Sequence, residues 1–205
     1  ISFQQLHGAL IKGVERTFNR ITIDGDTSTN DMILVMANGA AGNPWIDDGA
    51  SQYQEIFQGT LEDLLKDLAL QIVADGEGAT KFFTIRVCGA REEADGERIA
   101  RTVANSSLVK TAFFGEDANW GRIMAAMGRS GVRIYPERVD IAFGDVVLVK
   151  NGMGLGKEAE KAATAVLKEK NIVVTIDLKD GRGCAEIYTC DFSIDYVKIN
   201  ADYRS

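Results

Sequence analysis

Segments with the periodicity of helices and segments with the periodicity of strands alternate along the whole chain, and this alternation constrains the fold most strongly. Apolar residues recur at helical spacing over residues 2–18 and again over residues 51–72. Runs typical of strands lie between and after these helices, without a repeated strand–helix–strand unit. The sequence therefore predicts a mixed α/β fold whose sheet is not all-parallel.

The expected elements end at glycines, prolines or polar turns. They are, in chain order, strands at 21–23, 32–39 and 81–90, a helix at 92–106, a strand, polar turn and short helix within 107–128, a hairpin over 138–152 that turns at Gly144–Asp145, a helix at 157–169, and a hairpin over 171–192 that turns at Asp180–Gly181. No internal repeat or linker-like tract separates them.

Composition excludes several classes of function. The formal net charge of −7 argues against nucleic acid or an anionic membrane as the main partner, and no apolar run approaches the roughly twenty residues of a membrane span. Cys88, Cys184 and Cys190 have no CxxC spacing, so we expect reduced thiols in or near a core. His7 is the only histidine, which argues against a zinc site or a Ser-His-Asp triad.

The stretch "ITIDGDTSTND", residues 21–31, places Asp24, Asp26 and Asp31 on one loop after a strand. An Asp-x-Asp phosphatase motif would use Asp24 as nucleophile and Asp26 as general acid, but the residues that follow match it only in part. A calcium loop needs glycine at its sixth position, where Thr29 stands. The alternative is an Asx-rich turn whose side chains satisfy loop amides.

Three other stretches are candidates for a site. Glu77 lies between two glycines in "GEGATK", residues 76–81, where it could hold an ammonium group or simply end a helix in solvent. The glycine-rich stretch 151–163 differs from a phosphate-binding Walker loop, since Glu158 stands where Ser or Thr is needed. The turn Asn119–Arg122 is either a site wall or a buried structural turn.

Four segments taken together resemble one family. They are "TFNRITIDGDTSTNDMILVMANG", "ADGEGATK", "SLVKTAFFGEDANWGRIMAAMG" and the terminal "YVKINADYRS". In this order they are similar to the β-subunit of glutamate N-acetyltransferase, also called ornithine acetyltransferase, and the resemblance spans essentially the whole chain.

The resemblance implies a layered αββα fold like that of N-terminal-nucleophile enzymes, completed by an α-subunit. Family precursors cleave themselves before a threonine, and the halves stay together as a cytoplasmic α2β2 assembly. The new N-terminal threonine takes acetyl from N-acetylornithine and gives it to glutamate in arginine biosynthesis, without a metal or cofactor. Some members also accept acetyl-CoA as a substrate. A nearby base, such as the free α-amine, makes a threonine hydroxyl nucleophilic.

This sequence lacks that threonine, which we expect in a short segment upstream of Ile1, so no catalytic residue is assigned within residues 1–205. The resemblance carries over three substrate-binding residues. Glu77 is implied to hold an ammonium group, while Asn200 and Ser205 are implied to contact the amino-acid substrate. We also expect a subdivision near residue 90, between a core (1–90) and a C-terminal lobe (91–205).

Two rival functions remain at this point. A related self-cleaved aminopeptidase or amidase on the same architecture would release the acyl group to water. A non-catalytic regulatory subunit would explain the missing threonine. For the loop from Asp24 to Asp31, our hypothesis is a rigid turn that borders the nucleophile.

Overall fold

The computed structural model describes residues 1–47 and 51–202, and the chain forms two compact units. Unit 1 comprises Ile1–Ile21 and Asp26–Ile72, and unit 2 comprises Thr22–Gly25 and the chain from Val73 onward. The subdivision expected near residue 90 is not one of these boundaries and stays a prediction.

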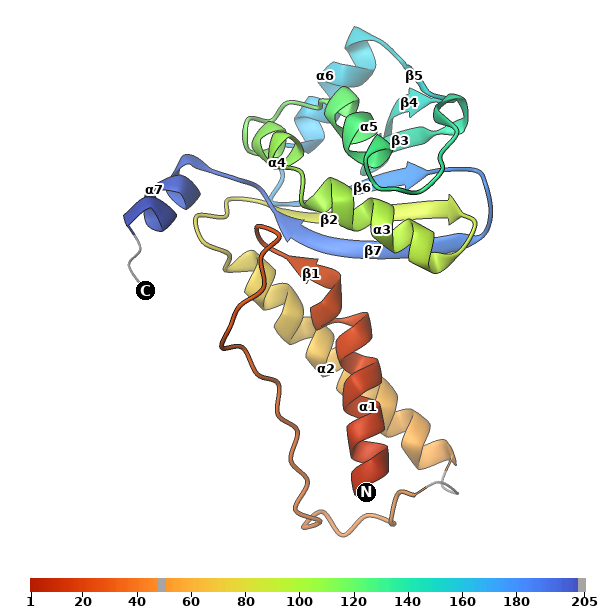
Figure 1. The fold of residues 1–205 in the computed structure, drawn as a ribbon, viewed down its shortest axis with the longest axis vertical. Coiled ribbons are helices and arrows are strands. Elements are labelled where there is room, and N and C mark those ends of the chain that lie inside the picture. The colour runs from red at the N-terminus through yellow and green to blue at the C-terminus, as the bar shows by residue number, and fades with distance from the viewer. Residues whose placement is uncertain (48–50, 203–205) are drawn as a thin grey trace. The chain divides into compact units, whose positions relative to one another are not determined.

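The elements appear in Figure 1. In chain order they are α1 (Phe3–Arg16), η1 (Phe18–Arg20), β1 (Ile21–Thr22), α2 (Ser51–Ala74), β2 (Phe82–Ala90), α3 (Glu93–Ala104), α4 (Ser107–Phe114), α5 (Trp120–Gly128), η2 (Pro136–Arg138), β3 (Asp140–Phe143), β4 (Val146–Lys150), β5 (Met153–Gly154), α6 (Lys157–Val166), β6 (Asn171–Asp177), β7 (Gly183–Cys190) and α7 (Ile194–Asp202). The mixed α/β class predicted from the sequence is confirmed.

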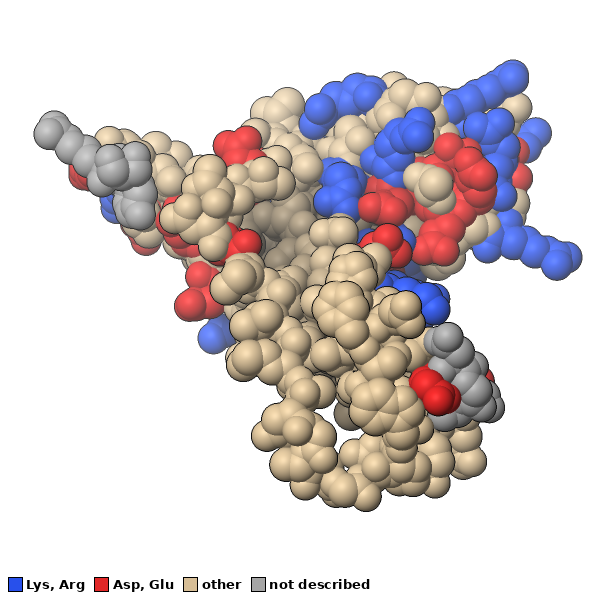
Figure 2. All heavy atoms as spheres, turned by 60° about the horizontal axis from the view of Figure 1, so that its bottom comes forward, with Lys and Arg blue, Asp and Glu red and all other residues tan. Residues whose placement is uncertain are grey.

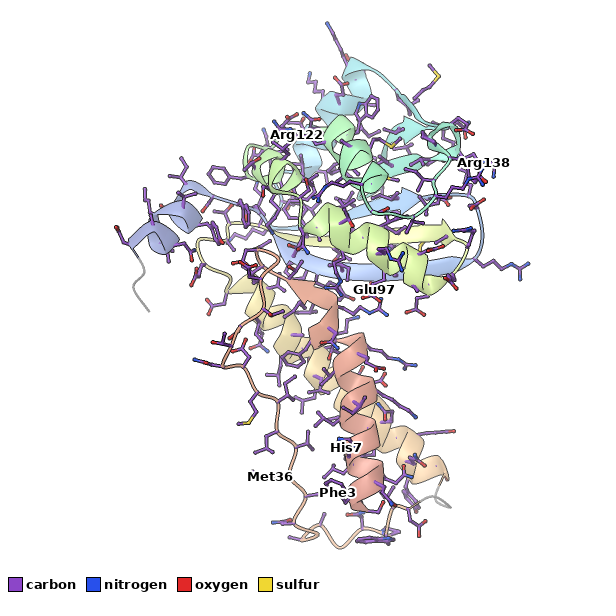
Figure 3. All side chains as sticks on the ribbon, in the orientation of Figure 1. Phe3, His7, Met36, Glu97, Arg122 and Arg138 are labelled. Atoms are coloured by element: carbon purple, nitrogen blue, oxygen red, sulfur yellow. A yellow bond between two sulfur atoms is a disulfide. The ribbon has the colours of Figure 1, made fainter. Side chains whose placement is uncertain are left out.

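Unit 1 is built on the close approach of α1 and α2. A Cβ atom added to Gly13 would lie 2.6 Å from the Leu65 side chain, so the glycine allows the two helices to touch. Arg16 and Glu62 form an ion pair (3.2 Å) beside this contact. His7 stacks on Phe3 with ring centroids 5.8 Å apart (Figure 3), and the residues that the structure describes contain no cluster suited to a metal ion.

The prediction of a buried strand at 32–39 is wrong. The segment forms neither helix nor strand, and Met32 (80%), Leu34 (64%) and Met36 (83%) are largely exposed. Ile33 and Val35 instead pack against the small core of unit 1. One side of this apolar run, formed by Ile33 and Val35, therefore packs on the core of unit 1. The other side, formed by Met32, Leu34 and Met36, is exposed.

Unit 2 contains a mixed sheet centred on β2. The strand order is β1-β7-β2-β6-β3-β4-β5, in which β2 pairs parallel with β6 and antiparallel with β7. Figure 1 shows α3 and α5 lying over this sheet. Their apolar residues and those of α4 and α6 share one core cluster with one face of the strands. Within that core Phe113 stacks on Phe83, with ring centroids 3.8 Å apart.

The hairpin predicted over 138–152 is confirmed, but the one over 171–192 is wrong. Strand β2 lies between β6 and β7, so the turn at Asp180–Gly181 crosses the end of β2 instead of joining two neighbours. A Cβ atom on Gly181 would lie 2.3 Å from the carbonyl oxygen of Ala90. The glycine thus serves a close crossing rather than a hairpin turn.

The first part of 107–128 was expected to be a strand and is helix α4 instead. Val109, Ala112 and Phe113 are its buried apolar residues, at helical spacing. Lys110 is buried beside them, and this interruption of the apolar pattern concealed the helix. The short helix expected next is α5.

The expectation of reduced thiols is contradicted at two cysteines. Cys88 and Cys184 form a disulfide, with Cα atoms 4.1 Å apart, whereas Cys190 is a buried free thiol. Pairing of β2 with β7 brings the two cysteines together across 96 residues, a separation that gave no signal in the sequence. Within residues 1–47 and 51–202, every helix is too short or too polar to cross a membrane.

Asp140 anchors the β3–β4 hairpin and yields a pH-dependent prediction. Burial acts to raise the pKa of Asp140, but hydrogen bonds from Lys150 (2.7 Å), Lys179 (2.6 Å) and the Asn151 amide (2.7 Å) outweigh it and lower that pKa to about 2. We expect Asp140→Asn to reduce the free energy of unfolding by roughly 1–2 kcal/mol at pH 6.

Because the folded-state pKa lies below the unfolded value, this stabilisation is present above about pH 4 and is lost as the pH falls toward 2. This stabilisation is measured as the difference in the free energy of unfolding between the native protein and Asp140→Asn, from denaturation followed by circular dichroism at pH 6 and at pH 3. Asp145→Asn, in the turn of the same hairpin, is the control. An equal loss for Asp140→Asn at both pH values would contradict the prediction.

Candidate functional site

The candidate site lies where β7 ends, opposite the start of β2. Antiparallel pairing places Cys190 beside Phe82, so the chain segments that flank these residues leave the sheet together. The carboxylate of Asp191, 1% exposed, accepts hydrogen bonds from the Thr80 amide (2.8 Å), the Thr80 hydroxyl (2.5 Å) and the Lys81 amide (2.9 Å). These donors compensate the cost of a buried carboxylate and join the two segments.

A serine two residues later attaches helix α7 to the same loop. The hydroxyl of Ser193 donates to the carbonyl oxygen of Gly78 (2.5 Å) and accepts from the amides of Asp195 (3.1 Å) and Tyr196 (3.3 Å), so it caps α7. Gly78 has φ +64°, and a Cβ atom there would lie 2.5 Å from the Tyr196 nitrogen. Glycine is therefore required at the contact between loop and helix.

Two of the three predicted substrate-binding residues meet across this contact. The side-chain amide of Asn200 donates to the carboxylate of Glu77 (2.7 Å) and to the carbonyl oxygen of Tyr196 (3.0 Å). Both side chains are exposed in this chain. The carboxylate of Glu77 can accept from an ammonium group, and the side-chain amide of Asn200 can donate to a carboxylate. An amino-acid head group carries both an ammonium group and a carboxylate. Ser205 lies outside the described residues.

Asp24 contributes to the same region, because the stretch 22–25 belongs to unit 2. Its carboxylate accepts from the hydroxyl of Tyr196 (2.9 Å), on α7. Thr22 donates to the side chain of Asn105 (2.7 Å), at the end of α3. The structure thus brings Asp24 onto the helix that carries Asn200.

The rest of the aspartate loop belongs to unit 1 and is a polar turn. The Asn30 amide donates to the Ser28 hydroxyl (3.2 Å), and the Thr29 hydroxyl donates to the Asn30 side chain (3.0 Å). The side chain that accepts a loop amide here is a serine hydroxyl, and the Asx-rich turn weighed from the sequence, in which Asp and Thr side chains satisfy loop amides, stays a prediction. The role proposed for Asp26 and Asp31 beside the nucleophile stays a prediction.

The other two candidates make structural contacts. Asn119 caps α5 by accepting from the Arg122 amide (3.1 Å), while the Arg122 guanidinium donates to the carbonyl oxygen of Leu108 (2.7 Å) and joins α4 to α5 (Figure 3). In the glycine-rich stretch, a Cβ atom on Gly152 would lie 2.2 Å from the Pro136 carbonyl oxygen. Close packing explains that glycine without a phosphate.

Sequence reasoning missed Lys110, which is fully buried next to the site. Its ammonium group donates to the Thr189 hydroxyl (2.7 Å) and to the carbonyl oxygen of Cys190. Burial lowers the pKa of Lys110 to about 8, although Cys190, Asp191 and Asp24 act to raise it. Burial likewise raises the pKa of the Cys190 thiol, against the nearby ammonium. A helical reading of 107–114 would have placed Lys110 among buried residues.

The chain resembles known proteins over its full length. The model of the ArgJ family matches residues 1–205. The protein named arginine biosynthesis bifunctional protein ArgJ is 69% identical in Desulfotalea psychrophila, over 100% of this chain and 52% of the relative. The protein of the same name in Geobacter sulfurreducens is 55% identical over 93% of this chain and 48% of the relative. The chain therefore spans about half the length of these relatives.

A solved structure has the same fold. The crystal structure of arginine biosynthesis bifunctional protein ArgJ from Bacillus halodurans matches with a TM-score of 0.93 at 44% identity. The match covers 99% of this chain and 95% of that chain. The fold described above is thus found in a chain of similar length.

Gly78 provides a test of the loop–helix contact. In Gly78→Ala the new Cβ atom collides with backbone of α7, so we expect the amides of residues 194–202 to exchange with deuterium at least tenfold faster. Gly131→Ala is the matched control, because Gly131 also has positive φ (+76°) but no atom within 4 Å of an added Cβ. That control should cost only the backbone strain, about 1 kcal/mol. Similar exchange of α7 in both variants would refute the contact.

Proposed function

Because the chain belongs to the ArgJ family, we propose that it is one subunit of an enzyme that transfers an acetyl group from N-acetylornithine to glutamate in arginine biosynthesis. The observation that carries this proposal is the 2.7 Å hydrogen bond between Glu77 and Asn200. These residues are 123 positions apart, and the resemblance independently marks both as substrate-binding.

In the proposed reaction Glu77 and Asn200 bind the amino-acid substrate, and the nucleophile is a residue outside this sequence. The Glu77 carboxylate holds an ammonium group of the amino-acid substrate, and the Asn200 amide orients the head group. A threonine upstream of Ile1 attacks the acetyl carbonyl carbon, and ornithine leaves with the proton that the base removed. The amine of glutamate then attacks the acetyl-threonine ester, which regenerates the hydroxyl. We propose the same binding role for Ser205.

The relatives named above are called bifunctional. We therefore propose a second activity, the acetylation of glutamate from acetyl-CoA through the same acetyl-threonine intermediate. We propose that neither reaction needs a metal or a cofactor, so activity should survive EDTA. The proposed compartment is the cytoplasm, where the Cys88–Cys184 disulfide would be open to reduction.

We propose that the partner is the remaining half of the precursor, in an α2β2 assembly. The chain covers about half of its relatives but 95% of the solved chain, as a subunit of a cleaved protein would. Phe3, Met32, Met36 and Trp45 of unit 1 are largely exposed, and Figure 2 shows few charged side chains on the side of unit 1 that comes forward. Large exposed apolar surfaces are typical of protein interfaces. The partner would also supply the second half of the αββα layers.

Variants of the complete enzyme test the binding roles. Glu77→Gln removes the negative charge, and Asn200→Ala removes the donor, of a hydrogen bond to a charged group, which is worth about 1.5–3 kcal/mol. We expect KM for N-acetylornithine and glutamate to rise about 10–100-fold, with a smaller change in kcat. Glu160→Gln, on the exposed face of α6, is the matched control and should leave both constants unchanged.

The reaction type is tested with N-acetylornithine in the presence and absence of glutamate. Ping-pong transfer predicts stoichiometric N-acetylglutamate, with turnover that depends on glutamate. Equal turnover without glutamate, with release of acetate, would indicate an amidase instead.

A further inference from the structure

The buried side chain of Lys110 contacts the residues that lead into α7. Its ammonium nitrogen lies 4.7 Å from the centroid of the Phe192 ring, in addition to its hydrogen bonds to Thr189 and Cys190. The Phe192 amide donates to the carbonyl oxygen of Lys110 (3.3 Å). A desolvated cation on a ring face is worth more than an exposed one. Both the backbone and the charge of Lys110 therefore hold Phe192.

Phe192 passes this constraint to α7. Its ring stacks on the ring of Tyr196, with centroids 4.4 Å apart and an interplanar angle of 14°. Tyr196 lies in the first turn of α7, and its hydroxyl donates to Asp24 (2.9 Å). Its carbonyl oxygen accepts from the side chain of Asn200, which also contacts Glu77. A continuous series of contacts thus runs from the buried ammonium to the substrate-binding amide.

We propose that Lys110 is a positioning residue: its positive charge, through Phe192 and Tyr196, holds α7 so that Asn200 meets Glu77. The link to substrate rests on the function proposed above, whereas the link to α7 does not. An apolar side chain of similar length would fill the same space. It would leave the Thr189 hydroxyl and the Cys190 carbonyl oxygen without the ammonium and remove the attraction for the ring.

The charge gives the proposal a pH signature. The titratable groups that face the ammonium are the Cys190 thiol on β7, Asp191 after it, and Asp24 in the stretch 22–25. Because burial lowers the pKa of Lys110 to about 8, the side chain is charged at pH 7 and largely neutral at pH 9. The contribution of the charge should therefore be present at pH 7 and lost as the pH rises through 8.

The test uses the complete enzyme with Lys110→Met and Phe192→Leu, and Lys161→Met as the matched control on an exposed face of α6. Deuterium exchange of residues 194–202 is expected to be at least tenfold faster in the first two variants and unchanged in the control. KM for glutamate should rise about tenfold at pH 7, with kcat within threefold. The ratio of KM in Lys110→Met to KM in the wild type should approach one at pH 9.

Unchanged exchange of α7 in both variants would overturn the proposal, as would a KM for Lys110→Met that is raised by the same factor over the wild type at pH 7 and pH 9. Should Lys110→Met fail to assemble, Phe192→Leu decides in the same exchange measurement, since it leaves the ammonium in place. Faster exchange of α7 with an unchanged KM would leave the positioning of the helix standing. It would instead count against the substrate-binding role of Asn200.

Discussion

The buried carboxylate of Asp191 is the interaction on which the candidate site depends. Glu77 precedes β2 and Asn200 follows β7, so the site exists only if the segments before one strand and after the other are held together. The pairing of Phe82 with Cys190 brings the two segments to one end of the sheet, and the three hydrogen bonds to Asp191 fasten them there. Strand pairing thus brings the two segments close to each other, and the hydrogen bonds to Asp191 fix their relative positions.

Local periodicity predicted most of the helices because each buries one apolar stripe against its own unit. It failed where the decisive partner is distant in the chain. Nothing in residues 171–192 indicates that β2 lies between β6 and β7, and the glycine that permits the crossing looks the same as a hairpin glycine. The apolar run at 32–39 was misinterpreted for another reason. Both of its faces are apolar, which is the pattern of a buried strand, but only one face packs on the core of unit 1.

The site residues were predictable to different degrees, for chemical reasons. Glu77 and Asn200 came from motif resemblance, because a lone glutamate and a lone asparagine have many roles. Asp191 and Ser193 gave no sequence signal, since their importance lies in which backbone groups they reach. Lys110 stands out only when residues 107–114 are read as a helix, because it then lies among buried apolar residues. Residues that bind a ligand occur in recognisable motifs, whereas residues that position them are visible only once the strands are paired.

Exposure of the Glu77–Asn200 pair limits what this chain can do alone. A carboxylate and an ammonium group in contact with water gain at most about 1 kcal/mol from each other. Selection of one amino acid among many requires more than this, and a lower local dielectric supplies it only when water is excluded. The contacts of Lys110, Phe192 and Tyr196 fix the pair from one side but do not cover it. The proposed partner chain therefore has a task at this site, which is to close it to solvent, and that closure would determine how strongly Glu77 binds the proposed substrate.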